Sequence, residues 1–230
     1  MLLVVAGDRD QPAQRFVEAH RARGVRRLSP RDLSTSGWQL RVSEPGADRC
    51  VVSGEPVPTD EVTGVITRIT SVREEDLPHI EAPDRAYVAA EMSAFLLAWL
   101  SALGCPVLNR PTPQSLMGPG YFTEQWMVAA ARAGLSVPQR TWRYPERRSL
   151  PAFDDGVTVT VVGDRCFGAV HESLAQGAQR LAAAAGTELL SVQLAGRGLG
   201  AAFLGAHLWP DISAPEVAGA IFERLLSVVA

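Results

Sequence analysis

The sequence predicts an α/β protein built from two successive portions. Of its 230 residues, 47% are hydrophobic and 20% are charged, which gives the chain enough apolar surface for a sizeable core. The chain opens with a buried-strand pattern at residues 2–6, followed by a helix pattern at residues 11–23. Strand and helix patterns then alternate along the rest of the chain, separated by clusters of Gly, Pro, Ser and Asp.

The first of these elements form a βα unit followed by a small mixed sheet. Gly24 is placed to end the first helix. Short β-type runs follow at residues 39–42, 50–53 and 62–69. The loop at residues 7–11 lacks the glycine spacing of a dinucleotide fingerprint, so no Rossmann-type cofactor site is predicted.

The middle of the chain contains two predicted helices with a short buried strand between them. The first helix covers residues 87–103, with Asp84 marking its start and Gly104 its end. The strand is expected at residues 105–108 and the second helix at residues 121–133.

The last part of the chain is predicted to be an α+β arrangement. It comprises a hairpin, a helix, two further strands and a closing helix, at residues 157–162, 166–170, 174–185, 189–194, 201–206 and 215–228.

Composition excludes several locations and partners. The apolar opening at residues 1–6 is too short for a signal peptide, and the helix at 87–103 carries Glu91 and is shorter than the roughly 20 apolar residues of a membrane span. We therefore predict a cytoplasmic protein with no membrane partner. The three widely spaced cysteines suit reduced thiols, and the net charge of −3 predicts no nucleic-acid partner.

All 22 basic residues are arginine, because the sequence contains no lysine. Chemistry that depends on lysine is therefore excluded, including Schiff bases, a P-loop lysine and the lysines of a standard nucleotide cradle. Arginine can still bind a phosphate or a carboxylate through its planar guanidinium group.

Short motifs follow one another in a distinctive order. They are Ile66-Thr67-Arg68, Asp84-Arg85-Ala86-Tyr87 with Glu91, Pro106 to Pro111, Ala133 to Thr141, Val161 to Asp164, and Phe203 to His207. This order resembles the ATP-grasp superfamily, in particular the ribosomal-protein glutamate ligases and the graspetide (microviridin-type) macrocyclases. The resemblance covers nearly the whole chain. It implies a pre-ATP-grasp-like α/β domain at residues 1–112 and a truncated ATP-grasp-like α+β portion at residues 113–230.

The chain departs from this family where the family's chemistry is located. ATP-grasp proteins hold the nucleotide between two subdomains, and the resemblance leaves only residues 143–156 for the lysine-bearing one, which is therefore predicted to be missing. In the family's final strand, the positions of two magnesium ligands are occupied here by Gly205 and His207. An upstream acidic ligand is replaced by Gln193. Since Mg²⁺ prefers carboxylate oxygens, we predict a degenerate member with neither a metal site nor a cofactor.

The favoured interpretation is a pseudoenzyme that serves as an accessory or peptide-binding subunit in a ligase or natural-product peptide-modification pathway. The resemblance implies a set of residues that would bind a partner, a peptide or a small carboxylate, namely Arg68, Arg85, Tyr87, Glu91, Asn109 and Arg110. Each of them also has a purely structural interpretation, because Tyr87 and Glu91, for example, lie one helical turn apart and can brace the domain.

The alternative is a ligase-derived enzyme with a repurposed site. Its candidates are His171 with Glu172 and His207 with Asp211, because a histidine and a carboxylate can share acid–base work. A further alternative is an ATP-dependent carboxylate–amine ligase that is active with a partner subunit, and only this one requires ATP and magnesium. A missing subdomain would expose apolar surface, so we expect a homo-oligomer or a complex with a full-length ATP-grasp ligase.

Overall fold

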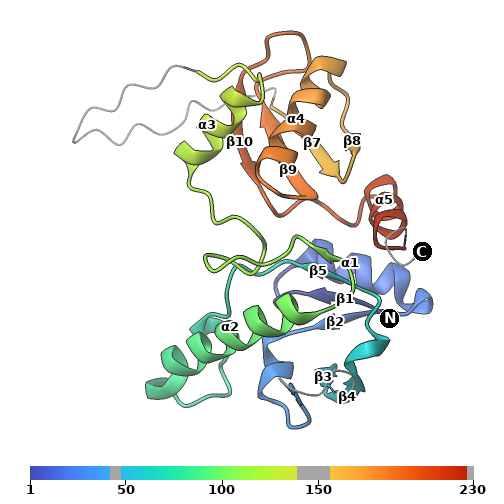
Figure 1. The fold of residues 1–230 in the computed structure, drawn as a ribbon, viewed down its shortest axis with the longest axis vertical. Coiled ribbons are helices and arrows are strands. Elements are labelled where there is room, and N and C mark those ends of the chain that lie inside the picture. The colour runs from blue at the N-terminus through green and yellow to red at the C-terminus, as the bar shows by residue number, and fades with distance from the viewer. Residues whose placement is uncertain (42–47, 139–155, 227–230) are drawn as a thin grey trace. The chain divides into compact units, whose positions relative to one another are not determined.

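The structure, a computed structural model, describes residues 1–41, 48–138 and 156–226. The chain forms two compact units, one made of Met1–Gly120 with Asp211–Ala230 and the other of Tyr121–Pro210. The chain therefore leaves the first unit after Gly120 and returns to it at Asp211. Figure 1 shows this order by colour, with red α5 belonging to the same unit as blue β1.

A parallel sheet of four strands forms the centre of the first unit. Its order is β2-β1-β5-β6, and Val5 of β1 pairs with Leu28 on one side and with Thr67 on the other. The segments that follow β1 and β5 consequently start side by side at the carboxyl edge of the sheet. The strands are β1 Leu2–Val5, β2 Val25–Leu28, β5 Gly64–Thr67 and β6 Val107–Leu108.

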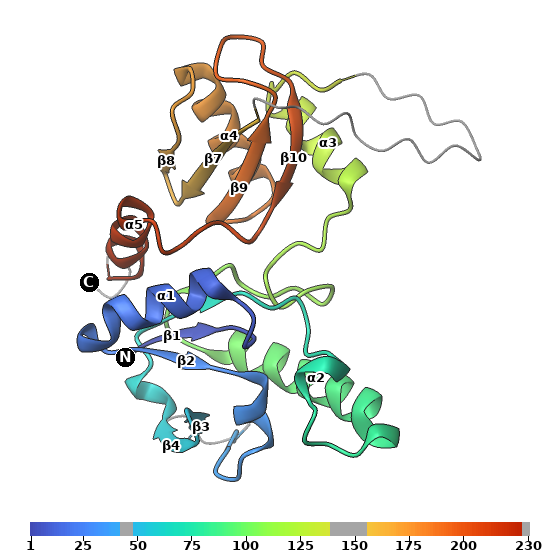
Figure 2. The ribbon, with the colours of Figure 1, turned by 180° about the vertical axis from the view of Figure 1, so that it is seen from behind.

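Helices cover both faces of this sheet, as Figure 2 shows for α1 and α2. Helix α2 packs Leu96, Trp99 and Leu100 into a core cluster that includes Leu3 and Val5. On the other face, Gly64 lies against a leucine of α5, which allows that helix to approach the sheet closely. The three helices are α1 Gln11–His20, α2 Arg85–Ala102 and α5 Pro215–Leu226.

Local sequence signals explain where α1 begins and ends. Asp10 accepts a hydrogen bond from the backbone N–H of Ala13 at 3.0 Å, which caps the start of the helix. After His20 the chain tightens into a 3₁₀ turn at Arg21–Arg23. It is closed by Gly24 at φ +79°, a conformation that favours glycine.

A two-stranded antiparallel ladder completes the first unit, formed by β3 Arg49–Val52 and β4 Glu55–Pro58. Of the strand predicted at residues 39–42, the described part contributes one bridge, between Gln39 and Arg49. Strands β2 and β4 had not been predicted.

The second unit is an antiparallel sheet in the order β10-β9-β7-β8 with two helices packed on it. Val192 and Leu194 of β9 are fully buried, whereas Gln193 between them is exposed. The elements are α3 Thr123–Arg132, β7 Val157–Val162, β8 Arg165–Phe167, α4 Glu172–Ala184, β9 Leu189–Leu194 and β10 Phe203–His207.

The predicted α/β fold class, a parallel α/β part followed by an α+β part, is confirmed. The packing units are not the predicted domains, because residues 113–120 and 211–226 pack with the first unit, and the boundary at residue 112 stays a prediction about family layout. Most of the segment at 143–156, where a subdomain was predicted to be missing, lies outside the described residues. Among the described residues, no helix has the length and apolarity needed to cross a membrane.

Candidate functional site

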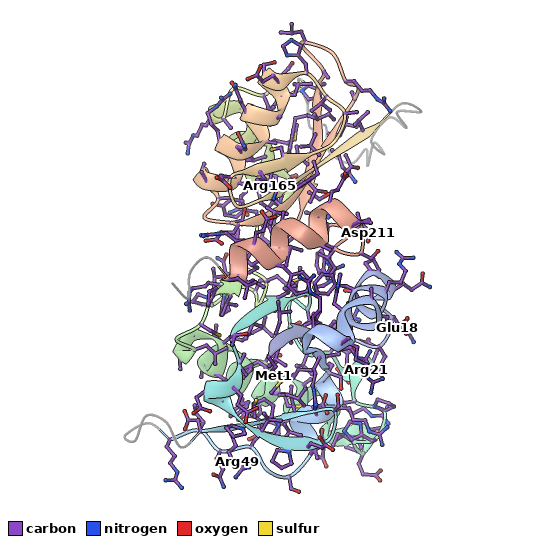
Figure 3. All side chains as sticks on the ribbon, turned by 90° about the vertical axis from the view of Figure 1, so that its right-hand side faces the viewer. Met1, Glu18, Arg21, Arg49, Arg165 and Asp211 are labelled. Carbon is purple, nitrogen blue, oxygen red and sulfur yellow. The ribbon has the colours of Figure 1, made fainter. Side chains whose placement is uncertain are left out.

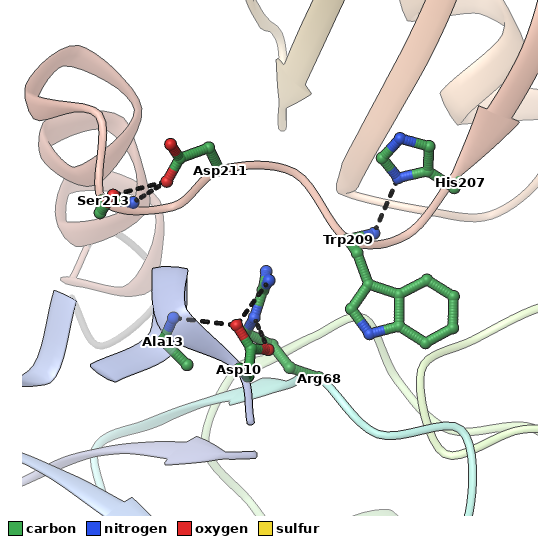
Figure 4. Close-up of polar contacts among 7 residues, drawn as sticks. All are labelled: Asp10, Ala13, Arg68, His207, Trp209, Asp211 and Ser213. Carbon is green, nitrogen blue, oxygen red and sulfur yellow. Dashed lines mark hydrogen bonds and ion pairs between the residues drawn. The ribbon is translucent and has the colours of Figure 1, made fainter. Parts of the chain in front are cut away.

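Arg68 and Asp10 meet at the carboxyl edge of the parallel sheet, because they follow the adjacent strands β5 and β1. Arg68 Nε donates to Asp10 Oδ2 at 2.6 Å and Nη2 donates to Oδ1 at 3.2 Å (Figure 4). The Arg68 side chain is only 2% exposed and that of Asp10 13%. Because the same carboxylate caps α1, this ion pair ties the end of β5 to the start of α1. The structure thus gives Arg68 an internal role, and its role in recognition stays a prediction.

Asp211 stands where the chain re-enters the first unit, ahead of α5, and Figure 3 labels it there. Its Oδ1 accepts hydrogen bonds from the backbone N–H and the hydroxyl of Ser213, at 3.0 and 2.5 Å. Its Oδ2 lies 3.6 Å from Arg15 Nη2. Burial raises the pKa of Asp211, but the Ser213 hydrogen bonds and the charges of Arg15 and Arg68 outweigh it and leave the pKa below its usual value. Asp211 is therefore an ionised anchor for this segment.

Three of the predicted recognition residues belong to α2. Arg85 is used locally, since its Nε donates to the Ile80 carbonyl at 2.7 Å and its Nη2 to the Pro78 carbonyl at 3.2 Å. Tyr87 is 70% exposed, and Glu91 is exposed one turn further along the same helix. Tyr87 and Glu91 are thus available on the surface to a partner.

The other two predicted recognition residues follow β6. Asn109 is 2% exposed, so it lies inside the first unit. Arg110 is exposed, and its Nη2 donates to the Cys105 carbonyl at 3.2 Å. The structure therefore offers Tyr87, Glu91 and Arg110 to the solvent, whereas Arg68 and Asn109 are buried.

The positions that the sequence resemblance assigns to magnesium ligands lie on the two neighbouring strands β9 and β10. Gly205 pairs directly with Gln193, and His207 pairs with Ser191. On the other side of β9, Gln193 pairs with Thr158 of β7. The three positions named from the sequence are therefore brought together in one short stretch of ladder.

These residues occupy the face of the sheet opposite α4. Cys166 Sγ lies 3.4 Å from the Ala175 carbonyl of α4, and Cys166 pairs with Val161, which places Val161 on the α4 side. Val161 in turn pairs with Leu190, so alternation along β9 puts Gln193 on the opposite side. The ladder shifts register between Phe203 and Gly205, and this shift turns Gly205 to the same side as Gln193.

The side chains on this face do not suit a magnesium ion. Gln193 offers an uncharged amide, Gly205 offers no side chain and His207 offers a nitrogen, whereas Mg²⁺ requires hard oxygen ligands. The four strands of the sheet contain no Asp or Glu. Within residues 1–41, 48–138 and 156–226, no group of three or more His, Cys, Asp and Glu side chains is placed to hold a metal ion.

His171 and Glu172 form the start of α4. His171 Nδ1 accepts from the backbone N–H of Ser173 at 3.2 Å and lies 2.9 Å from its hydroxyl, so the ring caps the helix. Glu172 Oε1 accepts from Gln176 Nε2 at 3.0 Å, one turn further along. These contacts are structural, and a catalytic role for the two residues stays a prediction.

The second predicted pair is divided between the two units. His207 belongs to the second unit, where its Nδ1 accepts from the backbone N–H of Trp209 at 3.3 Å (Figure 4). Asp211 belongs to the first unit. Each makes its own local hydrogen bonds, and shared acid–base work by the pair stays a prediction.

The three cysteines are free thiols. Burial raises the pKa of Cys50 and that of Cys166 to about 11, and it also raises the pKa of Cys105. All three are therefore protonated at neutral pH, which makes them poor nucleophiles.

Sequence reasoning missed the partner of Arg68 and the neighbours of Gln193. In the sequence, Asp10 is a polar residue that follows a predicted strand. Pro12 and an apolar pattern come after it, and this combination could have identified Asp10 as a helix cap. Thr158 and Ser191 gave no signal of their own, because their proximity to Gln193 and His207 follows from strand pairing.

No protein-family model matches the sequence, and no curated protein matches it either. Solved structures do match over almost the entire chain. The macrocyclase MdnC from Microcystis aeruginosa MRC, bound with precursor peptide MdnA, superposes with a TM-score of 0.67 at 12% identity, covering 98% of this chain and 99% of MdnC.

Two further structures extend this similarity. A RiPP-associated ATP-grasp ligase from Chryseobacterium gregarium, in complex with ADP and a leader and core peptide, gives a TM-score of 0.66 at 8% identity, covering 99% of this chain and 96% of that one. A RimK-domain ATP-grasp protein from Sphaerobacter thermophilus DSM 20745 gives 0.52 at 16% identity, covering 98% and 100%. The chain therefore has the fold of these ATP-grasp proteins.

Proposed function

We propose that this chain is an ATP-grasp-fold protein that has lost nucleotide and magnesium binding and acts as an accessory, peptide-binding subunit in a peptide-modification pathway. One observation carries the proposal. In the ladder between β9 and β10, the positions that the resemblance assigns to the family's two acidic ligands and one asparagine ligand hold Gln193, Gly205 and His207, and these residues lie together on one face of the sheet.

Electrostatics explains why this change matters. ATP brings several negative charges, which ATP-grasp proteins offset with Mg²⁺ and lysines. Here the strands of the second sheet contain no carboxylate to hold the ion, and the chain contains no lysine to face the phosphates. Arginine alone would then have to offset the phosphate charge. Any charge left uncompensated in a site of low dielectric constant costs several kcal/mol, on the order of the desolvation penalty for one buried ion.

The pathway and the ligand class are supported by the similar structures. MdnC was solved with its precursor peptide, and the Chryseobacterium gregarium ligase with leader and core peptides. In this chain, Tyr87, Glu91 and Arg110 are exposed on the first unit and suit the recognition of a peptide or of a ligase surface. The remaining predicted residues, Arg68, Arg85 and Asn109, would support that surface from within.

The first test is calorimetric titration of the full chain with ATP and magnesium, repeated with a non-hydrolysable analogue and accompanied by thermal-shift measurements. We expect no heat of binding and no shift in Tm at about 1 mM nucleotide. For comparison, a ligand at this concentration with a Kd near 1 mM would raise the free energy of unfolding by only about 0.4 kcal/mol. Magnesium-dependent binding in the micromolar range would contradict the proposal and restore ligase activity as the leading function.

A restored variant makes the test sharper. Gln193→Glu, Gly205→Glu and His207→Asn together place two carboxylates and an amide in the β9–β10 ladder. We expect this triple variant to bind Mn²⁺, measured by electron paramagnetic resonance, where the parent chain does not. A matched control, Gln176→Glu with Ala183→Glu, adds the same charge to the exposed surface of α4 and should bind no Mn²⁺. Equal Mn²⁺ binding by the parent, the control and the triple variant would show that the residues of the β9–β10 ladder do not determine metal binding.

The accessory role is tested against any full-length ATP-grasp ligase and any short precursor peptide whose genes lie beside the gene of this chain. We expect one of them to bind with micromolar affinity in fluorescence anisotropy and Tyr87→Ala with Glu91→Ala to weaken binding at least tenfold. The control is Glu18→Ala with Arg21→Ala, at exposed positions in α1 and in the 3₁₀ turn that follows it. Binding that survives the α2 changes, or no binding to either partner, would count against this role.

A further inference from the structure

Helix α5 belongs to the first unit, although the chain reaches it only after completing the second unit. Figure 2 shows α5 beside α1. The two units are therefore joined twice, once between Gly120 and Tyr121 and once between Pro210 and Asp211. If α5 left its place on α1, the second connection would lose its anchor there, and the first connection would hold the units together. The contacts between α5 and α1 thus decide how firmly the two units are joined.

Phe222 is the residue through which α5 makes its aromatic contacts with α1. Its ring is stacked on that of Phe16, with centroids 5.6 Å apart and an angle of 21° between the planes. His20, the last residue of α1, lies edge-on against both rings, 4.8 Å from Phe222 and 4.9 Å from Phe16. The guanidinium carbon of Arg23 stands 4.2 Å from the centre of the Phe222 ring. Phe16, His20 and Arg23 together form what we call the Phe222 cage.

His20 is the member of the Phe222 cage whose charge changes near neutral pH, since arginine stays charged and phenylalanine does not titrate. A neutral imidazole suits a place against two phenyl rings. An imidazolium would have to give up water there, and it would stand near the charge of Arg23. Burial is the larger of these two causes, and together they lower the pKa of His20 below the ordinary 6.5.

Arg23 is the charged residue that acts on the His20 ring. The dipole of α1 favours a positive charge at its last residue, but burial and Arg23 outweigh this effect, because the pKa of His20 is lowered overall. The other charged residues on the elements around the ring do not reverse that direction. They are Arg15 and Glu18 on α1, Arg21 in the 3₁₀ turn, and Glu216, Glu223 and Arg224 on α5.

From this geometry we infer that α5 is a pH-sensitive latch, which stays on α1 while His20 is neutral and is released when His20 takes up a proton. In the released state the ring regains its water. Release therefore begins as the pH falls through about 6.5 and is complete below the lowered pKa of the docked state. Each unit of difference between these two pKa values raises the equilibrium constant for release about tenfold. The latch lies within the first unit and does not depend on the proposed function.

Hydrogen exchange of the full chain, followed by mass spectrometry at about pH 7.5 and about pH 5.5, tests the latch. The rates are corrected for the intrinsic effect of pH on amide exchange. We expect the amides of α5 to exchange at least about threefold faster at the lower pH. The amides of β9, a central strand of the second unit, are the internal reference and should keep their corrected rate.

Substitutions at the Phe222 cage assign the effect to His20. His20→Phe keeps an aromatic ring that cannot take up a proton, so the exchange of α5 should be slow at both pH values. His20→Gln should also remove the pH response, even if it loosens α5 at both. Arg23→Gln should reduce the response without abolishing it, because burial is the larger cause. The control is His79→Gln, at an exposed ring, which should respond like the parent.

Three results would overturn the inference. They are an exchange rate of α5 that does not change with pH, an equal acceleration of α5 and β9, and a pH response that persists in His20→Phe. The second of these would indicate a general loss of stability in place of local release. Titrations with ATP and magnesium are made at neutral pH, where the latch is closed, so failure of the latch is distinguishable from failure of the proposed function.

Discussion

Leu135 lies so close to Gly177 of α4 that a Cβ atom on the glycine would stand 2.5 Å from Leu135 Cδ2 and 3.0 Å from Cγ. Leu135 is 5% exposed and so has little space in which to move. The absence of a side chain at residue 177 therefore sets how closely the segment after α3 packs on α4.

Gly177→Ala should destabilise the protein for this reason. Alanine gains about 1 kcal/mol over glycine in helix propensity, but overpacking a buried contact costs about 1–3 kcal/mol. We expect a net loss of about 1 kcal/mol in the free energy of unfolding, measured by urea denaturation.

Gly219→Ala is the matched control, because residue 219 is also helical, within α5, and has no atom within 4 Å of the added Cβ. This variant should gain about 0.5–1 kcal/mol from propensity alone. Equal effects of the two substitutions would show that the Leu135 contact does not limit packing.

Breaking the buried ion pair of Arg68 and Asp10 should lower the free energy of unfolding by more than Gly177→Ala does. Arg68→Met removes one partner and leaves the carboxylate of Asp10, 13% exposed, without its cation. Breaking a buried pair in this way costs about 3–5 kcal/mol, measured by chemical denaturation.

Two further variants test that explanation. Arg68→Met combined with Asp10→Asn should recover much of the loss, because asparagine keeps the helix cap without the charge. Arg26→Ala, which breaks the exposed pair with Glu55, should change stability by at most about 0.5 kcal/mol. If the double variant is as unstable as the single one, the unpaired charge is not the cause.

The surroundings of His20 predict that the stability of the folded protein depends on pH. Its ring lies 4.9 Å from that of Phe16 and 4.8 Å from that of Phe222, and burial followed by the nearby charge of Arg23 lowers its pKa below the ordinary 6.5. The unfolded chain therefore takes up a proton first as the pH falls. Stability is fully present above about pH 6.5 and declines below it.

Thermal unfolding at a series of pH values between about 8 and about 5 measures this decline. His20→Gln should flatten the profile, whereas His79→Gln, at an exposed ring that contacts the hydroxyl of Ser34, should keep it. An unchanged slope in His20→Gln would assign the pH dependence to other groups.

We expect substitutions of Trp99 by Phe and by Ala to change the stability of the protein by very different amounts. Its side chain is 1% exposed, its ring packs edge-on against Trp38 at 5.4 Å, and its indole N–H has no hydrogen-bond partner among the described residues. Trp99→Phe removes an unsatisfied donor, whose burial costs about 1–3 kcal/mol, but it also loses some packing. Because these two effects oppose each other, the free energy of unfolding should change by less than about 1 kcal/mol. Trp99→Ala should cost about 3–5 kcal/mol. Comparable losses for both would indicate that the N–H is satisfied in solution.

Much of the fold could be predicted because many elements carry strong local signals. Helix α2 has a start signal at Asp84 and continuous apolar residues, and β9 was predicted over its full length. Strand β2 could not be predicted, since Arg26 and Arg27 occupy its centre. These arginines are tolerated because β2 is an edge strand whose polar residues reach solvent.

The candidate site was only partly predictable for a different reason. The sequence shows Gln193, Gly205 and His207, but these residues share one face of the sheet only because of a register shift in β10. The residue types in β10 do not predict that shift. Likewise, Arg68 and Asp10 are 58 positions apart, and only the parallel pairing of β5 with β1 brings them together. Long-range pairing, unlike local propensity, leaves little trace in a single sequence.

The return of the chain to the first unit has a consequence for its synthesis. Residues 121–210 are continuous, so the second unit can fold as soon as they leave the ribosome. The parallel sheet lacks part of its cover until α5 is made, because Phe222 stacks on Phe16 at 5.6 Å and Leu225 packs over Gly64. The part of the chain made first is thus completed last, and until then the apolar surface around Phe16 and Gly64 is without its α5 cover.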